Sequence, residues 1–481
     1  MLFNSLEFTL FLPIVFLIYW FLVNKNLKLQ NFFLLIASYV FYGWWDWRFL
    51  SLILFSTIVD YLVGIQIYNS PTKQLKKVWL WVSLGVNLGF LGFFKYYNFF
   101  IKSWMDAWGT VGYEMSPYTI KVILPVGISF YTFQTLSYSI DIYRGKLKPT
   151  KDFLALATFV SFFPQLVAGP IERATNLLPQ FYKKRQFEYR KAVDGMRQIL
   201  WGLFTKVVIA DNCAVTVNTL FADYTSYNGS ELLLGAILFA FQIYGDFAGY
   251  SNIAIGTAKL FGFNLIRNFS YPYFSRDIAE FWRRWHISLS SWFKDYVYIP
   301  LGGSHGGRWQ QIRNTFIIFT VSGLWHGANW TFIAWGALNA IYFLPLLLSN
   351  KNRKNLDITS KGQLLPSLKE FFQIITTFML TVIAWIFFRS DTIIDALYFI
   401  ETAFTKWGEL PSYNIGLEII NTSKLCALML IVEWIQRSEN HGLMIENKIN
   451  SRIIRWAIYY FIIIMILHYS TSNQEFIYFQ F

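Results

Sequence analysis

The stretch Ser322-Gly323-Leu324-Trp325-His326-Gly327-Ala328-Asn329-Trp330 places one histidine between small residues and tryptophans. Apolar runs flank it on both sides, at residues 316–321 and 331–348. An ionisable side chain at membrane depth is costly, so His326 is a candidate functional residue. The alternative is a core histidine that hydrogen-bonds to a neighbouring helix, and the rest of the chain has to distinguish the two.

Composition points to a membrane protein. The 481 residues are 55% hydrophobic, 20% aromatic and 14% charged, whereas a soluble domain carries about 25% charged residues. Apolar runs recur that are long enough to span a bilayer, at about 20 residues each. We therefore predict an all-α polytopic membrane protein with a single transmembrane domain over residues 1–481. The first run, 8–23, lacks the basic start and cleavage site of a signal peptide, so we predict a retained helix.

Charge and cysteine content exclude several other classes of protein. The net charge of +13 comes from short loops between apolar runs, a pattern that records membrane orientation and predicts no nucleic-acid partner. Cys213 and Cys426 form neither a disulfide framework nor a CxxC pair. His286, His305 and His326 lack HxxxH spacing, and carboxylates near them are sparse, so we predict no metal site.

The charges of the loops give a predicted topology. The predicted spans are 8–23, 31–45, 49–67, 78–94, 122–140, 196–221, 231–256, 371–388, 415–435 and 454–470. Pairs of spans separate the basic loops 24–30, 68–77 and 141–153, so all three are placed in the cytoplasm. The same count places the N-terminus and the C-terminus on the outer side.

Two segments are predicted to be re-entrant hairpins. The apolar run 153–169 lies between two basic segments that both belong in the cytoplasm, and it contains Pro164. Basic residues also flank the His326 stretch on both sides, and a helix over 315–325 rises only about 16 Å, half the hydrocarbon thickness. His326 is therefore predicted near mid-membrane at the bend of a broken hairpin. It would face a cavity, because non-helical backbone at that depth must be covered.

Residues 276–296 are predicted to form one amphipathic helix in the membrane interface. Its apolar stripe, spaced by three and four, consists of Ile278, Trp282, Trp285, Leu289, Trp292 and Tyr296. His286 lies beside the stripe, and a helix leaning into the protein would present it to the cavity of His326. Two histidines there suit general acid–base catalysis, because imidazole titrates near neutral pH.

The glycine-rich loop 300–308 is a weaker candidate. Its backbone N–H groups would cradle a phosphate of the donor, with Arg308 and Arg313 adding charge. The loop has no P-loop or Rossmann pattern, and a simple turn is the alternative.

Polar residues interrupt the apolar span 231–256. They are Gln242, Asp246, Tyr250, Ser251 and Asn252. They either line the cavity or join helices by hydrogen bonds. The aromatic end of the chain, 474–481, is likewise open to two interpretations: an interfacial anchor, or a phenol that accepts an acyl group.

Six ordered motifs resemble one known family. They are MLFNS (1–5), FYGWWD (41–46), LPVGISFYTFQ (124–134), FPQLVAGPI (163–171), FWRRWH (281–286) and WHGANW (325–330). The chain resembles the membrane-bound O-acyltransferase superfamily, and within it the bacterial alginate and peptidoglycan O-acetylation proteins. The D-alanyl transferase of teichoic acid modification is a close cousin.

The resemblance implies a ring of about ten to eleven transmembrane helices, plus re-entrant hairpins, around a central funnel. The catalytic histidines of the family fall on His326 and His286. The residues expected to line or support the funnel are Trp325, Asn329, Trp282, Asp246 and Gln242. Tyr478 matches a tail tyrosine proposed to carry the acyl group.

The resemblance also implies an activity. An acyl group, expected to be acetyl, passes from a cytoplasmic thioester such as acetyl-CoA through the bacterial inner membrane, without a permanently bound cofactor. A periplasmic SGNH-type partner then delivers it to an extracellular polysaccharide, alginate-like or a cell-wall glycan. Two alternatives stay open: a transporter that moves an acyl donor or lipid chemically unchanged, and a relative that acylates a lipid or protein.

Overall fold

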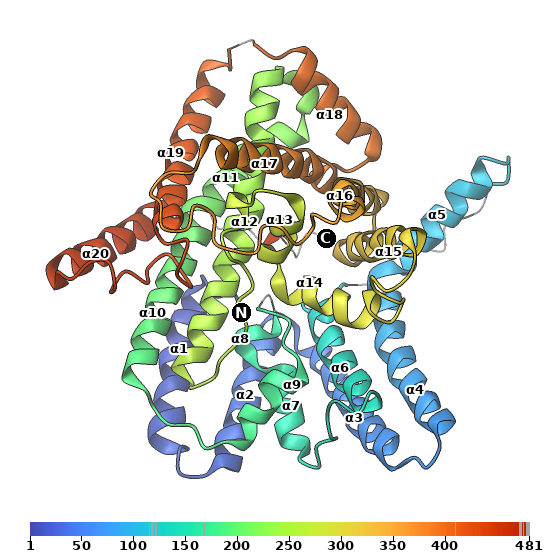
Figure 1. Cartoon of the computed structure of the whole chain (residues 1–481). Coiled ribbons are helices and arrows are strands. Elements are labelled where there is room, and N and C mark those ends of the chain that lie inside the picture. The colour runs from blue at the N-terminus through green and yellow to red at the C-terminus, as the bar shows by residue number, and fades with distance from the viewer. Residues whose placement is uncertain are drawn as a thin grey trace. The chain divides into compact units, whose positions relative to one another are not determined.

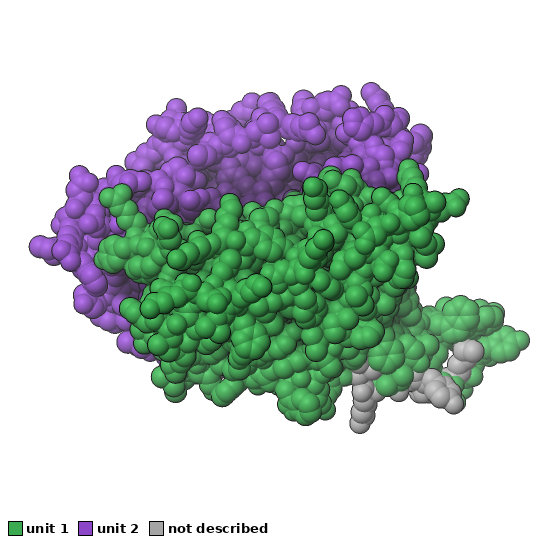
Figure 2. All heavy atoms as spheres, turned by 90° about the horizontal axis from the view of Figure 1, so that it is seen from below, with its two compact units in different colours: residues 1–195, 257–266 green, residues 196–256, 267–481 purple. Residues whose placement is uncertain are grey.

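A computed structural model describes residues 1–114, 116, 120, 123–167, 169–408, 410–470, 474 and 476–477, without the side chains of Tyr413 and Asn414. These residues form helices and no strands (Figure 1). The chain divides into two compact units (Figure 2). Unit 1 comprises residues 1–195 and 257–266, and unit 2 comprises residues 196–256 and 267–481.

Eight helical segments in the described part of the chain are long and apolar enough to cross a membrane. They are Leu27–Asn69, Lys73–Gly109, Tyr189–Ala222, Gly229–Leu260, Trp330–Leu348, Leu368–Arg389, Ile415–Ile435 and Arg452–Tyr469, with the shorter apolar helix Leu6–Leu22 preceding them. The prediction of an all-α polytopic membrane protein is confirmed. The count of ten to eleven spans, the funnel, the single-domain organisation and the sides of the termini stay predictions.

Unit 1 contains the first helices of the chain. They are α1 (Leu6–Leu17), α2 (Leu27–Asp46), α3 (Leu50–Asn69), α4 (Lys73–Leu91), α5 (Tyr97–Gly109), α6 (Ile128–Tyr143), α7 (Phe153–Ser161), α8 (Phe163–Leu166) and α9 (Ala174–Leu177). Asp60 joins three of them: its carboxylate accepts hydrogen bonds from Ser83 in α4 at 2.5 Å and from Ser139 in α6 at 2.7 Å. Polar contacts of this kind hold helices together where apolar surfaces alone give no preference.

The apolar run 153–169 is interrupted just before Pro164, but its re-entrant course in the membrane stays a prediction. α7 and α8 contain 9 and 4 residues and are separated at Phe162 (φ −52°, ψ 107°). The side chains around this break are buried. The predicted span 122–140 is wrong at its start: α6 begins at Ile128, because Gly127 adopts a left-handed conformation (φ 75°) that ends the preceding loop.

Unit 2 contains most of the remaining helices. α10 (Tyr189–Leu203) begins in unit 1 and runs through a π-helical segment (Phe204–Ala210) into α11 (Asp211–Ala222), and α12 (Gly229–Leu260) ends in unit 1. The others are α13 (Ile278–Arg284), α14 (Ile287–Phe293), α15 (Arg308–His326), α16 (Trp330–Leu348), α17 (Leu368–Arg389), α18 (Ile393–Thr405), α19 (Tyr413–Ile435) and α20 (Arg452–Tyr469). α5 and α18 were not among the predicted spans.

The single amphipathic helix predicted over 276–296 is wrong. The chain breaks between α13 and α14, where His286 adopts a left-handed conformation (φ 43°, ψ 54°) that a non-glycine residue rarely takes. Two backbone hydrogen bonds hold the break, from Ser270 N–H to Arg284 O at 2.9 Å and from Ile287 N–H to Asn268 O at 2.8 Å. The stripe residues Trp285, Leu289 and Trp292 are buried at 2%, 2% and 5% exposure. These stripe residues therefore pack into unit 2.

The bend predicted at His326 is confirmed, but the helix before it is longer than predicted. α15 and α16 contain 19 residues each and pack side by side as a hairpin (Figure 1). α15 rises about 28 Å, close to a full hydrocarbon thickness. The prediction counted only the apolar part of α15, whereas polar residues extend the helix back to Arg308. The helix length therefore no longer supports a mid-membrane depth for His326.

Two glycines allow α15 and α16 to approach closely. A Cβ atom on Gly323 would overlap the carbonyl oxygen of Phe332, and one on Gly336 would overlap that of Phe319.

We expect Gly323→Ala to push the hairpin apart at the turn that positions His326. The apparent melting temperature and the acyl-transfer rate should both fall, because overpacking costs about 1–3 kcal/mol. Gly89→Ala in α4 is the control, since its Cβ meets open space. Equal melting temperatures for the two variants would contradict the prediction.

Candidate functional site

The structure brings His286 and His326 together in unit 2. Their ring centroids lie 6.5 Å apart, with an angle of 62° between the ring planes. His326 is the last residue of α15, and His286 occupies the break between α13 and α14. Both are buried, with 3% and 1% exposure. The end of α15 and the break between α13 and α14 thus bring two histidines, 40 residues apart in the sequence, into one pair.

The hydrogen bonds of His286 determine which ring nitrogen carries the proton. The Asn268 Oδ1 atom accepts hydrogen bonds from the Ser288 N–H at 3.3 Å and the Ser288 hydroxyl at 2.9 Å. Because the backbone N–H is only a donor, the atom facing it is the amide oxygen of Asn268. His286 Nδ1, 3.1 Å from the same oxygen, must therefore donate. The Nε2 atom keeps a lone pair.

That lone pair is held in a buried and neutral ring. His286 Nε2 has no hydrogen-bond partner among the described residues. Burial lowers the pKa of His286 well below its ordinary value, since removal from water disfavours the imidazolium form. A neutral imidazole with an open Nε2 can accept a proton from a hydroxyl group, as a general base must.

This buried state predicts a pH dependence of stability. The folded pKa lies below the unfolded value of about 6.5, so the unfolded chain binds the proton first. The free energy of unfolding should fall as the pH drops below that value and stay level above it. The fall in melting temperature from pH 7 to pH 5 should be smaller in His286→Gln than in the wild type. His305→Gln, at an exposed position, should resemble the wild type, and a similar fall in all three proteins would contradict the assignment.

Aromatic rings enclose His326. Its ring centroid lies 4.9 Å from Trp325, 5.2 Å from Trp335 and 5.4 Å from Phe388. Trp325 also contacts His286, with centroids 6.1 Å apart. Trp335 comes from α16 and Phe388 from α17. His326 therefore lies in a buried aromatic environment, in which electrostatic interactions are little screened by water.

Trp282 and Asn329, two further residues predicted to support the site, hold neighbouring elements in place. The Trp282 indole N–H donates to Asn339 at 3.3 Å, and its ring lies 5.6 Å from Trp335. Asn329 caps α16 by accepting the Thr331 N–H, and it also donates to Asp391 O at 2.8 Å. Both residues hold the elements that enclose His326.

Asp246 belongs to a buried charge cluster. Lys206 Nζ lies 2.7 Å from a carboxylate oxygen of Asp211 and 2.7 Å from one of Asp246. All three side chains are at most 3% exposed. Gln242 lies one turn before Asp246 on α12, and its Oε1 atom has no partner within the described residues. Of the polar residues that interrupt the predicted span 231–256, Asp246 thus lies in a buried charge cluster.

The same cluster holds the end of the chain. The backbone N–H of Ile477 donates to Asp246 Oδ2 at 2.6 Å, and Lys206 donates to Gln474 O at 3.3 Å. Phe476 is fully buried, with its ring centroid 6.2 Å from that of Phe247. Phe247 in turn lies 4.5 Å from the His286 ring. The tail therefore packs one side chain away from the histidine pair. The candidate acyl carrier, Tyr478, lies outside the described residues.

The glycine-rich loop is closed on itself. The N–H groups of Gly302, Gly303 and His305 donate to backbone oxygens within residues 298–302. Arg313 donates to Asn314 Oδ1 and Leu301 O, and Arg308 is exposed at the start of α15. Three N–H groups that would bind a phosphate are thus already used. The donor-phosphate role of Arg308 and Arg313 stays a prediction.

Sequence reasoning missed several residues of this site. They are Asn268, Ser288, Trp335, Trp385 and Phe388. Asn268 lies in an irregular segment without periodicity, and its role depends on an 18-residue separation from His286. No local pattern distinguishes it from a loop asparagine. No group of three His, Cys, Asp or Glu side chains suited to a metal ion occurs among the described residues.

Several known proteins are similar in sequence to this chain. The model of the MBOAT, membrane-bound O-acyltransferase family, matches residues 147–388, which include both histidines. The chain is 40% identical to the probable alginate O-acetylase AlgI of Pseudomonas aeruginosa, over 92% of this chain and 83% of that protein. It is 32% identical to the peptidoglycan O-acetyltransferase of Helicobacter pylori, over 100% and 98%. It is 30% identical to the teichoic acid D-alanyltransferase of Bacillus subtilis, over 45% and 57%.

Proposed function

This chain belongs to the membrane-bound O-acyltransferase family, and we propose that it moves an acetyl group from a cytoplasmic thioester to an extracellular polysaccharide. Membership makes the protein an acyltransferase. The relatives that align along nearly its whole length are named for O-acetylation of alginate and of peptidoglycan. Their names support acetyl as the acyl group and an alginate-like or cell-wall glycan as the final acceptor.

The observation that carries the proposal is the buried histidine pair. In the proposed step, His326 removes the proton from an acceptor hydroxyl, whose oxygen attacks the thioester carbonyl. The carbon–sulfur bond breaks, and the leaving thiolate takes up the proton, which releases a free thiol. His286 assists with its neutral Nε2, and Asn268 keeps that nitrogen unprotonated. Acetyl-CoA is the proposed donor, and no permanently bound cofactor is required.

The proposed first acceptor is Tyr478. Support comes from the two residues before it. Ile477 is hydrogen-bonded to Asp246. The ring of Phe247 contacts both the Phe476 ring and the His286 ring. An aryl ester is activated, so a periplasmic SGNH-type partner would pass the acetyl group on to a sugar hydroxyl. This route requires the tail to face the periplasm, as the topology predicted from loop charges has it. The bacterial inner membrane is the location that the family resemblance implies.

Release of free coenzyme A from acetyl-CoA by the purified full chain tests the proposal. An enzyme must release a thiol, whereas a transporter moves its cargo chemically unchanged. We expect thiol release together with one acetyl group on Tyr478, detected by peptide mass spectrometry. An acetyl group found instead on a co-purified lipid or protein would favour the alternative acceptors. Transport of intact acetyl-CoA into proteoliposomes without thiol release would overturn the proposal.

A further inference from the structure

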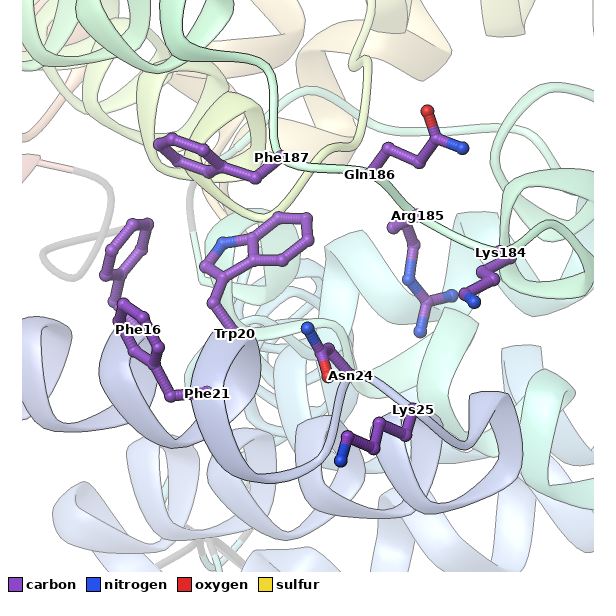
Figure 3. A pocket seen from close by; sticks show the side chains of 9 residues that line it. All are labelled: Phe16, Trp20, Phe21, Asn24, Lys25, Lys184, Arg185, Gln186 and Phe187. Atoms are coloured by element: carbon purple, nitrogen blue, oxygen red, sulfur yellow. The ribbon is translucent and has the colours of Figure 1, made fainter.

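Unit 1 contains a cavity of about 610 Å³, away from the histidine pair in sequence. Figure 3 shows its walls, which come from the end of the first helix and from residues 184–187. Four aromatic side chains form the apolar part of the lining: Phe16, Trp20, Phe21 and Phe187. Trp20 is fixed in place, because its indole N–H donates to Leu260 O at 2.9 Å.

The polar part of the lining is cationic. Lys25, Lys184 and Arg185 line the cavity, together with the amides Asn24 and Gln186, and no carboxylate of the described residues does. The two lysines are exposed, whereas Arg185 is only 7% exposed. The cavity therefore combines three positive charges with an aromatic wall.

Arg185 is a built element of this cavity. Its Nε and Nη2 atoms donate to Gln30 Oε1 at 3.1 and 2.8 Å, and Nη2 also donates to Asn31 Oδ1 at 2.8 Å. These partners are neutral, and no ion pair to Arg185 occurs within the described residues. Its third nitrogen, Nη1, is buried without a hydrogen-bond partner there. A buried charge held only by neutral groups favours a bound anion.

The cavity lies where an apolar helix meets a basic loop. The apolar helix Leu6–Leu22 ends beside it, with Phe21 and Leu22 exposed at 73% and 71%. Lys25 and Lys28 follow directly in the sequence. Exposed apolar side chains followed by lysines are typical of the membrane boundary, where lipid headgroups lie.

We propose that this cavity binds one anionic phospholipid, with the phosphate between Lys25, Lys184 and Arg185. An acyl chain of this lipid lies against the aromatic wall and leaves the cavity over the exposed Phe21 side chain. Loop charge places both lysines on the cytoplasmic side, where the leaflet of the membrane is anionic. The lipid would tie the first helix to the basic segment after the re-entrant hairpin.

Native mass spectrometry of the full chain in detergent tests the site with phosphatidylglycerol as the probe. The variant Lys25→Gln/Lys184→Gln removes the exposed cations and leaves Arg185, which holds the fold, in place. Its matched control is Lys28→Gln/Lys183→Gln, which removes the same charge from nearby positions outside the cavity, in the first turn of α2 and next to Lys184. At about 1 kcal/mol per lysine, we expect roughly 30-fold weaker retention in the first variant. The control variant should retain the lipid as the wild type does.

Three results would overturn the assignment. Equal losses in both double variants would mean that the lipid responds to overall surface charge. Equal retention of phosphatidylcholine would mean that the cations do not select an anion. Displacement of the lipid by glycerol 3-phosphate or coenzyme A at matched concentration would make the cavity a site for a soluble phosphate. Selective, saturable retention of one phosphatidylglycerol, reduced only by Lys25→Gln/Lys184→Gln, would support the lipid site.

Discussion

Replacing His326 by alanine is expected to lower the rate of thiol release from acetyl-CoA by about 10²–10⁴-fold, the usual contribution of a general base. His326 is buried among aromatic rings, and in the proposed step it acts on the reacting hydroxyl, so the loss should appear in the rate at saturating donor. The measurement is free coenzyme A released over time by purified protein in detergent.

The control for this variant is His305→Ala. His305 is exposed in the glycine-rich loop, so its loss should leave the rate unchanged. Both variants must elute as a single species in size-exclusion chromatography, which separates a catalytic effect from misfolding. If folded His326→Ala released thiol at the wild-type rate, the role given to His326 would be wrong.

Replacing Asp246 by asparagine is expected to release the C-terminal tail. The change removes the charge from the hydrogen bond that Ile477 N–H donates, and bonds to charged groups contribute about 1.5–3 kcal/mol. Tail docking should weaken by roughly 10- to 150-fold. Hydrogen exchange at the Ile477 amide should accelerate by a similar factor, and acetylation of Tyr478 should fall with it.

Asp211→Asn is the matched control for the tail. Asp211 pairs with the same Lys206 nitrogen, but the bonds that hold the tail come from Asp246 and Lys206. The Asp211→Asn substitution removes an equal charge from the same cluster and leaves the hydrogen bond from Ile477 to Asp246 in place. Equal exchange rates at Ile477 in the two variants would mean that the cluster stabilises the helices without positioning the tail.

Local patterns predicted those parts of the fold that depend on neighbours in sequence. Apolar runs of sufficient length predicted the long helices, because the hydrocarbon interior requires each span to satisfy its own backbone. The bend predicted at His326 is confirmed, and the apolar run that contains Pro164 is interrupted at Phe162. The limits of helices were less well predicted: α15 extends through polar residues that an apolar count excludes.

The sequence by itself determined the helical class, the family, the bend at His326 and both candidate histidines, because each is encoded in a contiguous run of residues. Only the tertiary structure decided how these parts act together. It broke the predicted helix at His286, oriented that ring through Asn268, and set Ile477 against Asp246, 231 positions away in the chain. Such contacts form between segments distant in sequence, and their energies depend on burial and hydrogen-bond geometry that appear only after the helices have packed.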